Sequence, residues 1–329
     1  MARFGLRALG IAIAFIAAAM VFPLGAVLHA AGYPDRAVKV IVPFPAGGVT
    51  DIATRLIAQK LSERLGQQFY IENIAGAGGN LGMANAARAP GDGYTILFSS
   101  SSIVVNPSLY KQMPFDVEKD FIPVTRAGAS PNSWLVNNEF AAKTMHGLIE
   151  AMKAEPGKLS VASPGTGTTP SLSIEMLKQA FGVSFVTVPF AGGGPLIQSL
   201  LGGFTPIAGA AIGNSVPLIK QGKIRALAIT SKRRLETLPD VPTLDELDIK
   251  DEEAETMTGV FVPAGTPTPI VELLQKEIAA IVRLPDIRSL LLENGVVPEG
   301  DSSADFAAYV KAEIAKWKKV IELAKIEKI

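Results

Sequence analysis

Residues 37–50 read AVKVIVPFPAGGVT, and this stretch decides the fold class. Residues 37–43 are β-branched and nearly continuously apolar, which is typical of a strand buried on both faces of a parallel sheet. A glycine turn follows. Apolar residues then recur at helical spacing over residues 51–65, until Gly66 ends the pattern. The stretch therefore predicts one strand–turn–helix unit of an α/β fold.

The same alternation continues along the chain. Further strands are predicted at 68–72, 94–98, 121–125, 133–137, 159–162, 183–189, 224–230 and 257–263, and helices at 145–154, 172–181, 196–201, 270–283, 287–293 and 304–327. Strands that alternate with helices in this way indicate α/β layers with a mostly parallel sheet.

One turn occurs twice. Residues 42–48 read VPFPAGG, and residues 188–194 read VPFAGGG. One interpretation is coincidence between two glycine-rich turns. The other is a pair of similar lobes, each of which offers a glycine turn and a helix N-terminus to a shared cleft, since ligands of open α/β sheets lie at the carboxyl ends of strands.

Four loops share one chemistry. Residues 43–50, 99–102, 163–169 and 189–195 each follow a predicted strand, are rich in Gly, Ser or Thr, and contain no Lys or Arg. Helix N-termini carry unpaired N–H groups and a partial positive charge, and glycine lets a ligand approach the backbone. Any single loop is explained by an ordinary turn with an N-cap. Together the four predict a site where neutral donors hold an anion such as a carboxylate.

Composition excludes several function classes. The 329 residues suggest two domains, and 31 basic residues balance 31 acidic ones, so the basic excess of a nucleic-acid-binding protein is missing. There is no cysteine, and the two histidines are His29 and His146. No nucleophile–base pair, metal site or Walker A motif emerges, and residues 76–82 (GAGGNLG) lack the G-x-G-x-x-G spacing. We therefore expect no catalytic residue, no metal and no cofactor.

The N-terminus predicts export. Arg3 and Arg7 precede an uncharged run over residues 8–28, and small residues follow at 30–32. This pattern is typical of a cleavable signal peptide, here residues 1–32; an uncleaved membrane anchor is the alternative. Cleavage would remove two arginines and leave a net charge of −2. We expect a periplasmic protein that is a monomer.

Several segments in order carry a resemblance to a known family. They are YP at 33–34, VPFPAGG at 42–48 with Thr50 and Asp51, GAGGNLG at 76–82, PGDGYT at 90–95, NPSLY at 106–110, LPDVPT at 238–243 and PAGTP at 263–267. Over nearly its whole length the chain resembles the periplasmic solute-binding receptors of tripartite tricarboxylate transporters, the Bug family.

The resemblance implies a fold, a domain division and a site. The fold would be a two-lobed, type II-like periplasmic binding protein, with residues 33–125 and 255–329 in lobe 1 and residues 126–254 in lobe 2. A ligand carboxylate would lie between the lobes. By position, the resemblance assigns it to Pro45, Ala46, Gly47, Ser100, Ser101, Ser163, Thr166, Gly167, Thr168, Phe190, Gly192 and Gly193.

Two departures from the family pattern bear on the ligand. Ala210 stands where many relatives carry an aspartate, and Phe190-Ala191 replaces the usual Tyr-Lys pair. An acid at the first position would pair with a ligand amine, so its absence disfavours amino acids. We expect a less polar pocket for an aliphatic or aromatic mono- or dicarboxylate.

The resemblance also implies a partner and leaves alternatives open. The receptor would deliver its ligand to the membrane permease subunits of the transporter. A receptor that presents its closed form to a membrane sensor kinase is a second interpretation, and a periplasmic hydrolase is a third. The third predicts turnover, which the missing catalytic base disfavours.

Overall fold

The computed structural model describes residues 32–250, 254–323 and 326–329. The signal-peptide prediction for residues 1–32 lies outside this part of the chain, except for Gly32. Within the described ranges, no helix is both long enough and apolar enough to cross a membrane.

Strands and helices alternate along the chain as the sequence predicts. The strands are β1 (Val38–Val42), β2 (Phe69–Asn73), β3 (Thr95–Ser99), β4 (Phe121–Asn137), β5 (Ser160–Ser163), β6 (Val186–Pro189), β7 (Ile207–Ala211), β8 (Ile224–Ile229), β9 (Glu255–Pro263) and β10 (Val297–Pro298). The helices are α3 (Val49–Leu65), α4 (Asn80–Ala87), α5 (Ser102–Leu109), α6 (Val117–Asp120), α7 (Met145–Ala154), α8 (Thr169–Phe181), α9 (Gly193–Leu201), α10 (Val216–Lys220), α11 (Thr268–Val282), α12 (Pro285–Glu293) and α13 (Ser303–Leu323).

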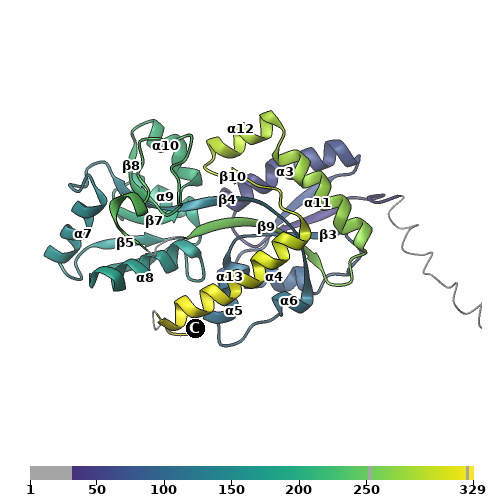
Figure 1. Cartoon of the computed structure of the whole chain (residues 1–329), viewed down its shortest axis with the longest axis horizontal. Helices are drawn as coiled ribbons and strands as arrows, with labels where there is room; N and C mark the ends of the chain where they lie inside the picture. Colours follow the sequence, from purple (N-terminus) through teal and green to yellow (C-terminus); the bar gives the residue numbers. More distant parts are fainter. Residues whose placement is uncertain (1–31, 251–253, 324–325) are drawn as a thin grey trace, which may run out of the picture.

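Two α/β halves lie side by side, and the strands β4 and β9 run through the middle between them (Figure 1). The strand order is β2-β1-β3-β9-β4-β7-β5-β6, with β8 and β10 also paired to β4. Pairing is parallel within β2-β1-β3 and within β7-β5-β6. The antiparallel pairs all involve β4 or β9. Each half therefore has a parallel core, to which the crossing strands add antiparallel pairs.

The strand β4 joins the halves. Its 17 residues include both predicted segments, 121–125 and 133–137. Residues 121–131 pair with β9, and residues 132–136 pair with β7, while β8 pairs over 133–137. The register with β9 shifts near Pro123 and near Gly128, so two bulges let the strand bend without ending.

Apolar side chains fill each half, and one further cluster joins them, because Leu172 of α8 packs with Ile41 and Phe261 of the other half. Val40, Ile96 and Leu274 belong to one core cluster in the half built on β1, β2 and β3. Trp134 and Val161 belong to a cluster in the other half. Each parallel sheet is thus covered by its own helices, which is the arrangement that parallel strands require.

All four predicted loops connect a strand to a helix. They join β1 to α3, β3 to α5, β5 to α8 and β6 to α9. The carboxyl ends of these strands face the space between the halves, so two loops from each half meet there.

Candidate ligand-binding site

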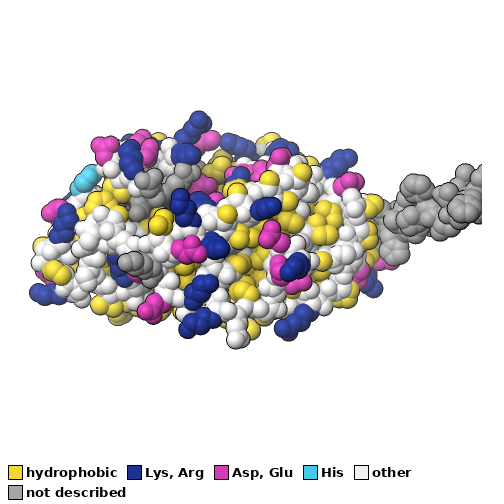
Figure 2. All heavy atoms as spheres, turned by 60° about the horizontal axis from the view of Figure 1, so that its bottom comes forward, with side chains coloured by type: hydrophobic (Ala, Val, Ile, Leu, Met, Phe, Trp, Pro, Cys, Tyr) yellow, Lys and Arg dark blue, Asp and Glu magenta, His cyan; other side chains and the backbone are white. Residues whose placement is uncertain are grey.

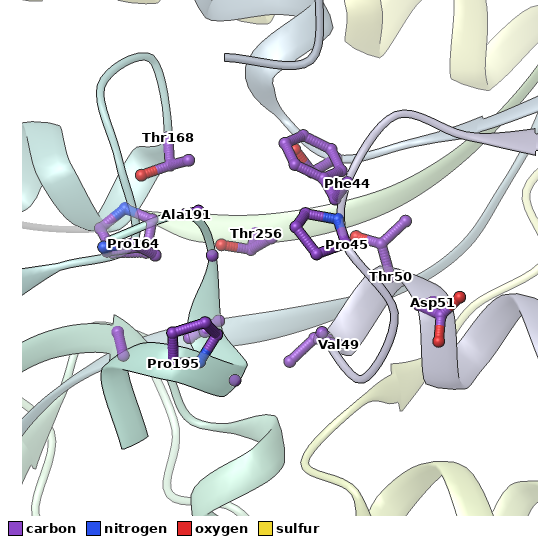
Figure 3. A pocket seen from close by; sticks show the side chains of 18 of the residues that line it. Phe44, Pro45, Val49, Thr50, Asp51, Pro164, Thr168, Ala191, Pro195 and Thr256 are labelled. Carbon is purple, nitrogen blue, oxygen red and sulfur yellow. The ribbon is translucent and has the colours of Figure 1, made fainter. Parts of the chain in front are cut away.

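A cavity of about 740 Å³, including its open mouth, lies between the two halves. We call it the first chamber. Figure 3 shows Pro45 and Val49 on one side, and Pro164 and Pro195 on the other, with Thr256 of β9 between them. The lining residues come from the loops and first turns of α3, α8 and α9, together with Ser100, Ala210, Ala211 and Thr256.

Of the helix N-termini that border the first chamber, two come from opposite halves and have no side-chain cap. The helix α3 begins after Gly48 and α9 begins after Gly192, and neither of these residues caps its helix with a side chain. Both glycines line the chamber. Because uncapped helix N-termini present N–H groups and partial positive charge, this arrangement suits an anion held by backbone donors.

Asp51 is the one charged residue among the described residues that line the first chamber. Its carboxylate is engaged elsewhere: it accepts the Gly47 N–H at 2.9 Å, two Arg55 donors at 2.9 Å and Asn73 Nδ2 at 2.9 Å. Burial opposes ionisation of Asp51, but the hydrogen bonds from Arg55, Gly47 and Asn73 outweigh it and lower the pKa. The ionised carboxylate therefore holds the first loop in shape.

A polar network forms part of the chamber wall where the strands cross. The hydroxyls of Thr169 and Thr256 lie 2.9 Å apart, and Thr256 Oγ1 donates to Asn132 Oδ1 at 3.0 Å. Asn132 Nδ2 in turn donates to Ser173 Oγ at 3.1 Å. Since these polar groups bond to one another, they fix the wall between β4, β9 and α8.

A second cavity, of about 790 Å³ including its open mouth, adjoins the first. We call it the second chamber. The turn at residues 76–79, Tyr110 and Thr166 line it, and none of them lines the first chamber. Phe190 also lines only the second chamber. Residues that the sequence grouped into one site therefore border two spaces.

The predicted residues fall into three groups. Those that line the first chamber are Pro45, Ala46, Ser100, Thr168, Gly192 and Gly193. Those that line the second are Pro45, Thr166, Thr168, Phe190 and Gly192. Those that line neither are Gly47, Ser101, Ser163 and Gly167.

The last group supports the walls through hydrogen bonds. Gly47 donates to Asp51. Ser101 Oγ donates to the Glu255 carbonyl at 3.0 Å and accepts from the Met257 N–H at 2.9 Å, which ties α5 to β9. Ser163 Oγ accepts the Gly165 N–H at 3.3 Å. These residues shape the loops.

Gly167 takes part in a contact between the halves. Ser102 Oγ, at the start of α5, donates to the Gly167 carbonyl at 2.7 Å, and this hydrogen bond is buried. A second contact joins Arg288 of α12 to Glu236 of the other half, with 3.2 Å between Arg288 Nη2 and Glu236 Oε1. The halves thus contact each other through polar groups at two places.

Sequence reasoning missed several lining residues. Thr256 lies at the start of β9, far along the chain from the four loops. Ile197 lies one turn into α9, where its helical spacing could have indicated that it faces the chamber. Ala210, singled out as a departure from the family pattern, does line the chamber.

Charged groups elsewhere are dispersed. Figure 2 shows basic and acidic side chains interspersed over one face of the molecule, with no broad patch of a single sign on that face. Within the described ranges, no three His, Cys, Asp or Glu side chains are grouped so that they could hold a metal ion.

Comparison with known proteins assigns the family. The family model described as "Tripartite tricarboxylate transporter family receptor" matches residues 53–326. The chain belongs to this receptor family. Its members are binding proteins of a transport system rather than enzymes, and the resemblance inferred from the sequence motifs is confirmed.

Individual relatives agree over most of the chain. Protein BugT of Bordetella pertussis is 33% identical over 303 residues, which cover 91% of this receptor and 92% of BugT. The structure of R. palustris Rpa4515 with adipate matches with a TM-score of 0.87 and 35% identity, over 90% of this receptor and 100% of that chain. MatC (Rpa3494) from Rhodopseudomonas palustris with bound malate matches with a TM-score of 0.82 and 32% identity. The match covers 88% of this receptor and 100% of that chain. The two-lobed periplasmic binding protein fold is thereby confirmed.

Proposed function

We propose that this receptor is exported by a cleavable signal peptide, residues 1–32, and captures a small organic carboxylate between its two lobes. The ligand is an aliphatic or aromatic mono- or dicarboxylate. The receptor then delivers it to the membrane permease subunits of a tripartite tricarboxylate transporter. Residues 33–125 and 255–329 form lobe 1, and residues 126–254 form lobe 2.

The observation that carries the proposal is the pair of uncapped helix N-termini at the first chamber. The helices α3 and α9 begin there from opposite halves, and no Lys or Arg is among the described lining residues. A carboxylate between them would accept N–H groups from both lobes. Such a ligand binds the closed form better than the open form, and that difference in affinity drives closure.

The solved relatives support a carboxylate rather than another anion. Rpa4515 was solved with adipate and MatC with malate. In this receptor the first chamber offers no acidic group to a ligand amine, since Asp51 is engaged and Ala210 lines the wall. The lining favours an acid without an amino group.

A thermal-shift screen tests the proposal. The full chain is expressed, and the mature protein is purified from the periplasm, unfolded and refolded to release any bound ligand. It is screened against mono-, di- and tricarboxylates, aromatic acids and amino acids. A ligand at a hundredfold excess over its dissociation constant adds about 2.7 kcal/mol of stability, which raises the unfolding midpoint. We expect a shift with non-amino carboxylates.

Two outcomes of the screen would contradict the proposal. A shift with amino acids alone would overturn the ligand class. A refolded protein with no shift for any acid would overturn the carboxylate receptor itself. N-terminal sequencing of the purified protein checks the export step, for which we expect residue 33 at the N-terminus.

A further inference from the structure

The two chambers share a border. Six residues line both of them: Phe44, Pro45, Pro164, Thr168, Ala191 and Gly192. Pro45 comes from one half and Gly192 from the other, and a Cβ built on Gly192 would lie 3.6 Å from Pro45 Cδ. The chambers are therefore neighbouring compartments of one cleft between the halves, and they meet at this contact.

The chambers differ in their aromatic lining. Phe44 is the single aromatic residue among the described residues that line the first chamber, and it stands on the shared border. The second chamber adds Tyr110 and Phe190. Aromatic rings pack well against other flat apolar groups, in edge-to-face or offset geometry. The second chamber thus offers more aromatic surface to a flat apolar group than the first does.

The chambers also differ in their capacity for charge. No described residue that lines the second chamber has a charged side chain. Two N–H groups at the turn that borders it are already bonded, because those of Gly79 and Leu81 both donate to the Gly76 carbonyl, at 2.9 and 3.4 Å. A carboxylate buried there would lose hydration without meeting a positively charged side chain, whereas the first chamber offers two uncapped helix N-termini.

Tyr110 adds a neutral polar group to the second chamber. Burial raises the pKa of its phenol, so the hydroxyl stays protonated at neutral pH. It lies beside the backbone of Gly78, where a built Cβ would come within 2.7 Å of the hydroxyl oxygen. The residue therefore offers an aromatic ring and a neutral hydroxyl rather than a charged partner.

From these contrasts we infer that the ligand is a monocarboxylate with an aromatic or bulky apolar tail, such as an arylalkanoate. Its carboxylate lies between α3 and α9 in the first chamber, and its tail lies between Phe190 and Tyr110 in the second. The inference rests on the proposed function and narrows its ligand class. It gives Phe190 the role of a specificity-determining residue.

A calorimetric series tests the inference on the refolded mature protein. The probes are propionate, adipate, 3-phenylpropionate and 4-phenylbutyrate. We expect at least one phenylalkanoate to bind about tenfold or more tightly than both propionate and adipate, since filling an apolar pocket with even one methylene changes affinity by about that factor or more.

Variants then locate the tail. The change Phe190→Leu keeps an apolar side chain but removes the ring that would pack against the tail. The change Thr166→Phe fills part of the second chamber with a new side chain, which leaves less room for the tail. Each should lower the ratio of phenylalkanoate to propionate affinity by about fivefold or more. Phe204→Ala is the matched control, because Phe204 is 86% exposed and lines neither chamber. It should leave the ratio unchanged.

The outcomes separate this inference from the proposed function. If adipate or propionate binds as tightly as the phenylalkanoates, the inference is wrong while the carboxylate receptor stands. The same holds if Phe190→Leu and Thr166→Phe weaken all acids equally, because the second chamber then makes no contact specific to the tail. If no acid of any kind binds the refolded protein, both fall.

Discussion

The backbone N–H of Gly47 donates to the carboxylate of Asp51 at 2.9 Å, and this hydrogen bond holds the loop of residues 43–50 against the first turn of α3. Gly47 has a positive φ of 83°, which a residue with a side chain adopts only under strain. The loop keeps this shape because Arg55 and Asn73 hold the carboxylate from the other side.

The change Asp51→Asn should weaken both the fold and the site. It removes the charge that Arg55, Gly47 and Asn73 share, so we expect a loss of about 2 kcal/mol in the free energy of unfolding at pH 7. Folding lowers the pKa of Asp51. The stability that its ionised carboxylate adds to the unmodified receptor is therefore complete above the ordinary aspartate pKa and is lost as the pH falls through the lowered pKa. Chemical denaturation at several pH values measures it.

Asp305→Asn is the control for this change. Asp305 lies in the first turn of α13, exposed, and also accepts a hydrogen bond from a neighbouring side chain, Ser302. We expect it to alter stability by less than about 0.5 kcal/mol. Equal effects of the two substitutions would show that Asp51 acts as an ordinary helix-start acid, without a role in holding the loop.

A β-branched side chain at residue 193 should block the first chamber. Gly193 lines the chamber as the first residue of α9, so Gly193→Val places two methyl groups where the ligand carboxylate is proposed to lie. We expect ligand binding to disappear while the protein stays folded, since valine in a helix destabilises it by less than about 1 kcal/mol. Calorimetry reports binding, and circular dichroism reports the fold.

Gln198→Val puts the same side chain on the exposed face of the same helix. It should leave the affinity within about twofold of that of the unmodified receptor. Unchanged binding by Gly193→Val would remove the start of α9 from the site.

The hydrogen bond from Ser102 to Gly167 should set how well the halves stay closed. Neither residue lines a chamber, so Ser102→Ala removes no side chain from the lining, although it also removes the acceptor of the Ser100 hydroxyl at 3.2 Å. It removes about 1 kcal/mol from the closed form, and apparent affinity should fall about fivefold, through faster ligand dissociation. Stopped-flow kinetics measures this.

Ser303→Ala is matched to it, because Ser303 Oγ donates to the Val124 carbonyl at 2.7 Å within one half. It should change stability without changing the dissociation rate. If both variants release ligand at the same rate as the unmodified receptor, the contact between Ser102 and Gly167 has no part in closure.

Glu299 should make stability depend on pH. Burial, together with the nearby acids Asp301 and Glu255, raises its pKa from 4.5 to about 7, although the adjacent Arg126 opposes the shift. For an acid with a raised pKa, the stabilising contribution is complete below the unfolded value and is lost as the pH rises through the folded value. The receptor should therefore lose stability from pH 4.5 towards about 7.

The change Glu299→Gln imitates the protonated acid and should flatten this dependence. The variant should match the unmodified receptor in acid and exceed it at pH 8. Glu293→Gln, on the exposed surface of α12, serves as the control and should retain the slope. If the free energy of unfolding depends on pH in the same way for the unmodified receptor and for Glu299→Gln, the raised pKa of Glu299 is contradicted.

The strand–helix alternation could be read from the sequence because its strands are β-branched and its helices end at glycine or proline. The strand β7 (IAGAA) was missed, since its small residues have no strand signature. The length of β4 was also missed, because Pro123, Gly128 and Pro131 are typical of strand ends. Pairing with β9 on one side overrides these local preferences.

The four loops could be predicted because each carries local chemistry at a strand end. Their division between two chambers could not, since it depends on how Pro45 of one half meets Gly192 of the other. Thr256 escaped for the same reason: it reaches the site through the pairing of β9 with β4. Contacts between segments that are far apart in the sequence cannot be predicted from the local pattern of either segment.

The most direct test of the central claim compares a carboxylic acid with its own primary amide. The refolded receptor is titrated calorimetrically with each acid of the screen and with the matching amide. If backbone N–H groups at the starts of α3 and α9 hold a carboxylate, at least one acid binds saturably and its amide binds about a hundredfold more weakly. An amide that binds as tightly as its acid, or a series in which no acid saturates, would contradict the claim.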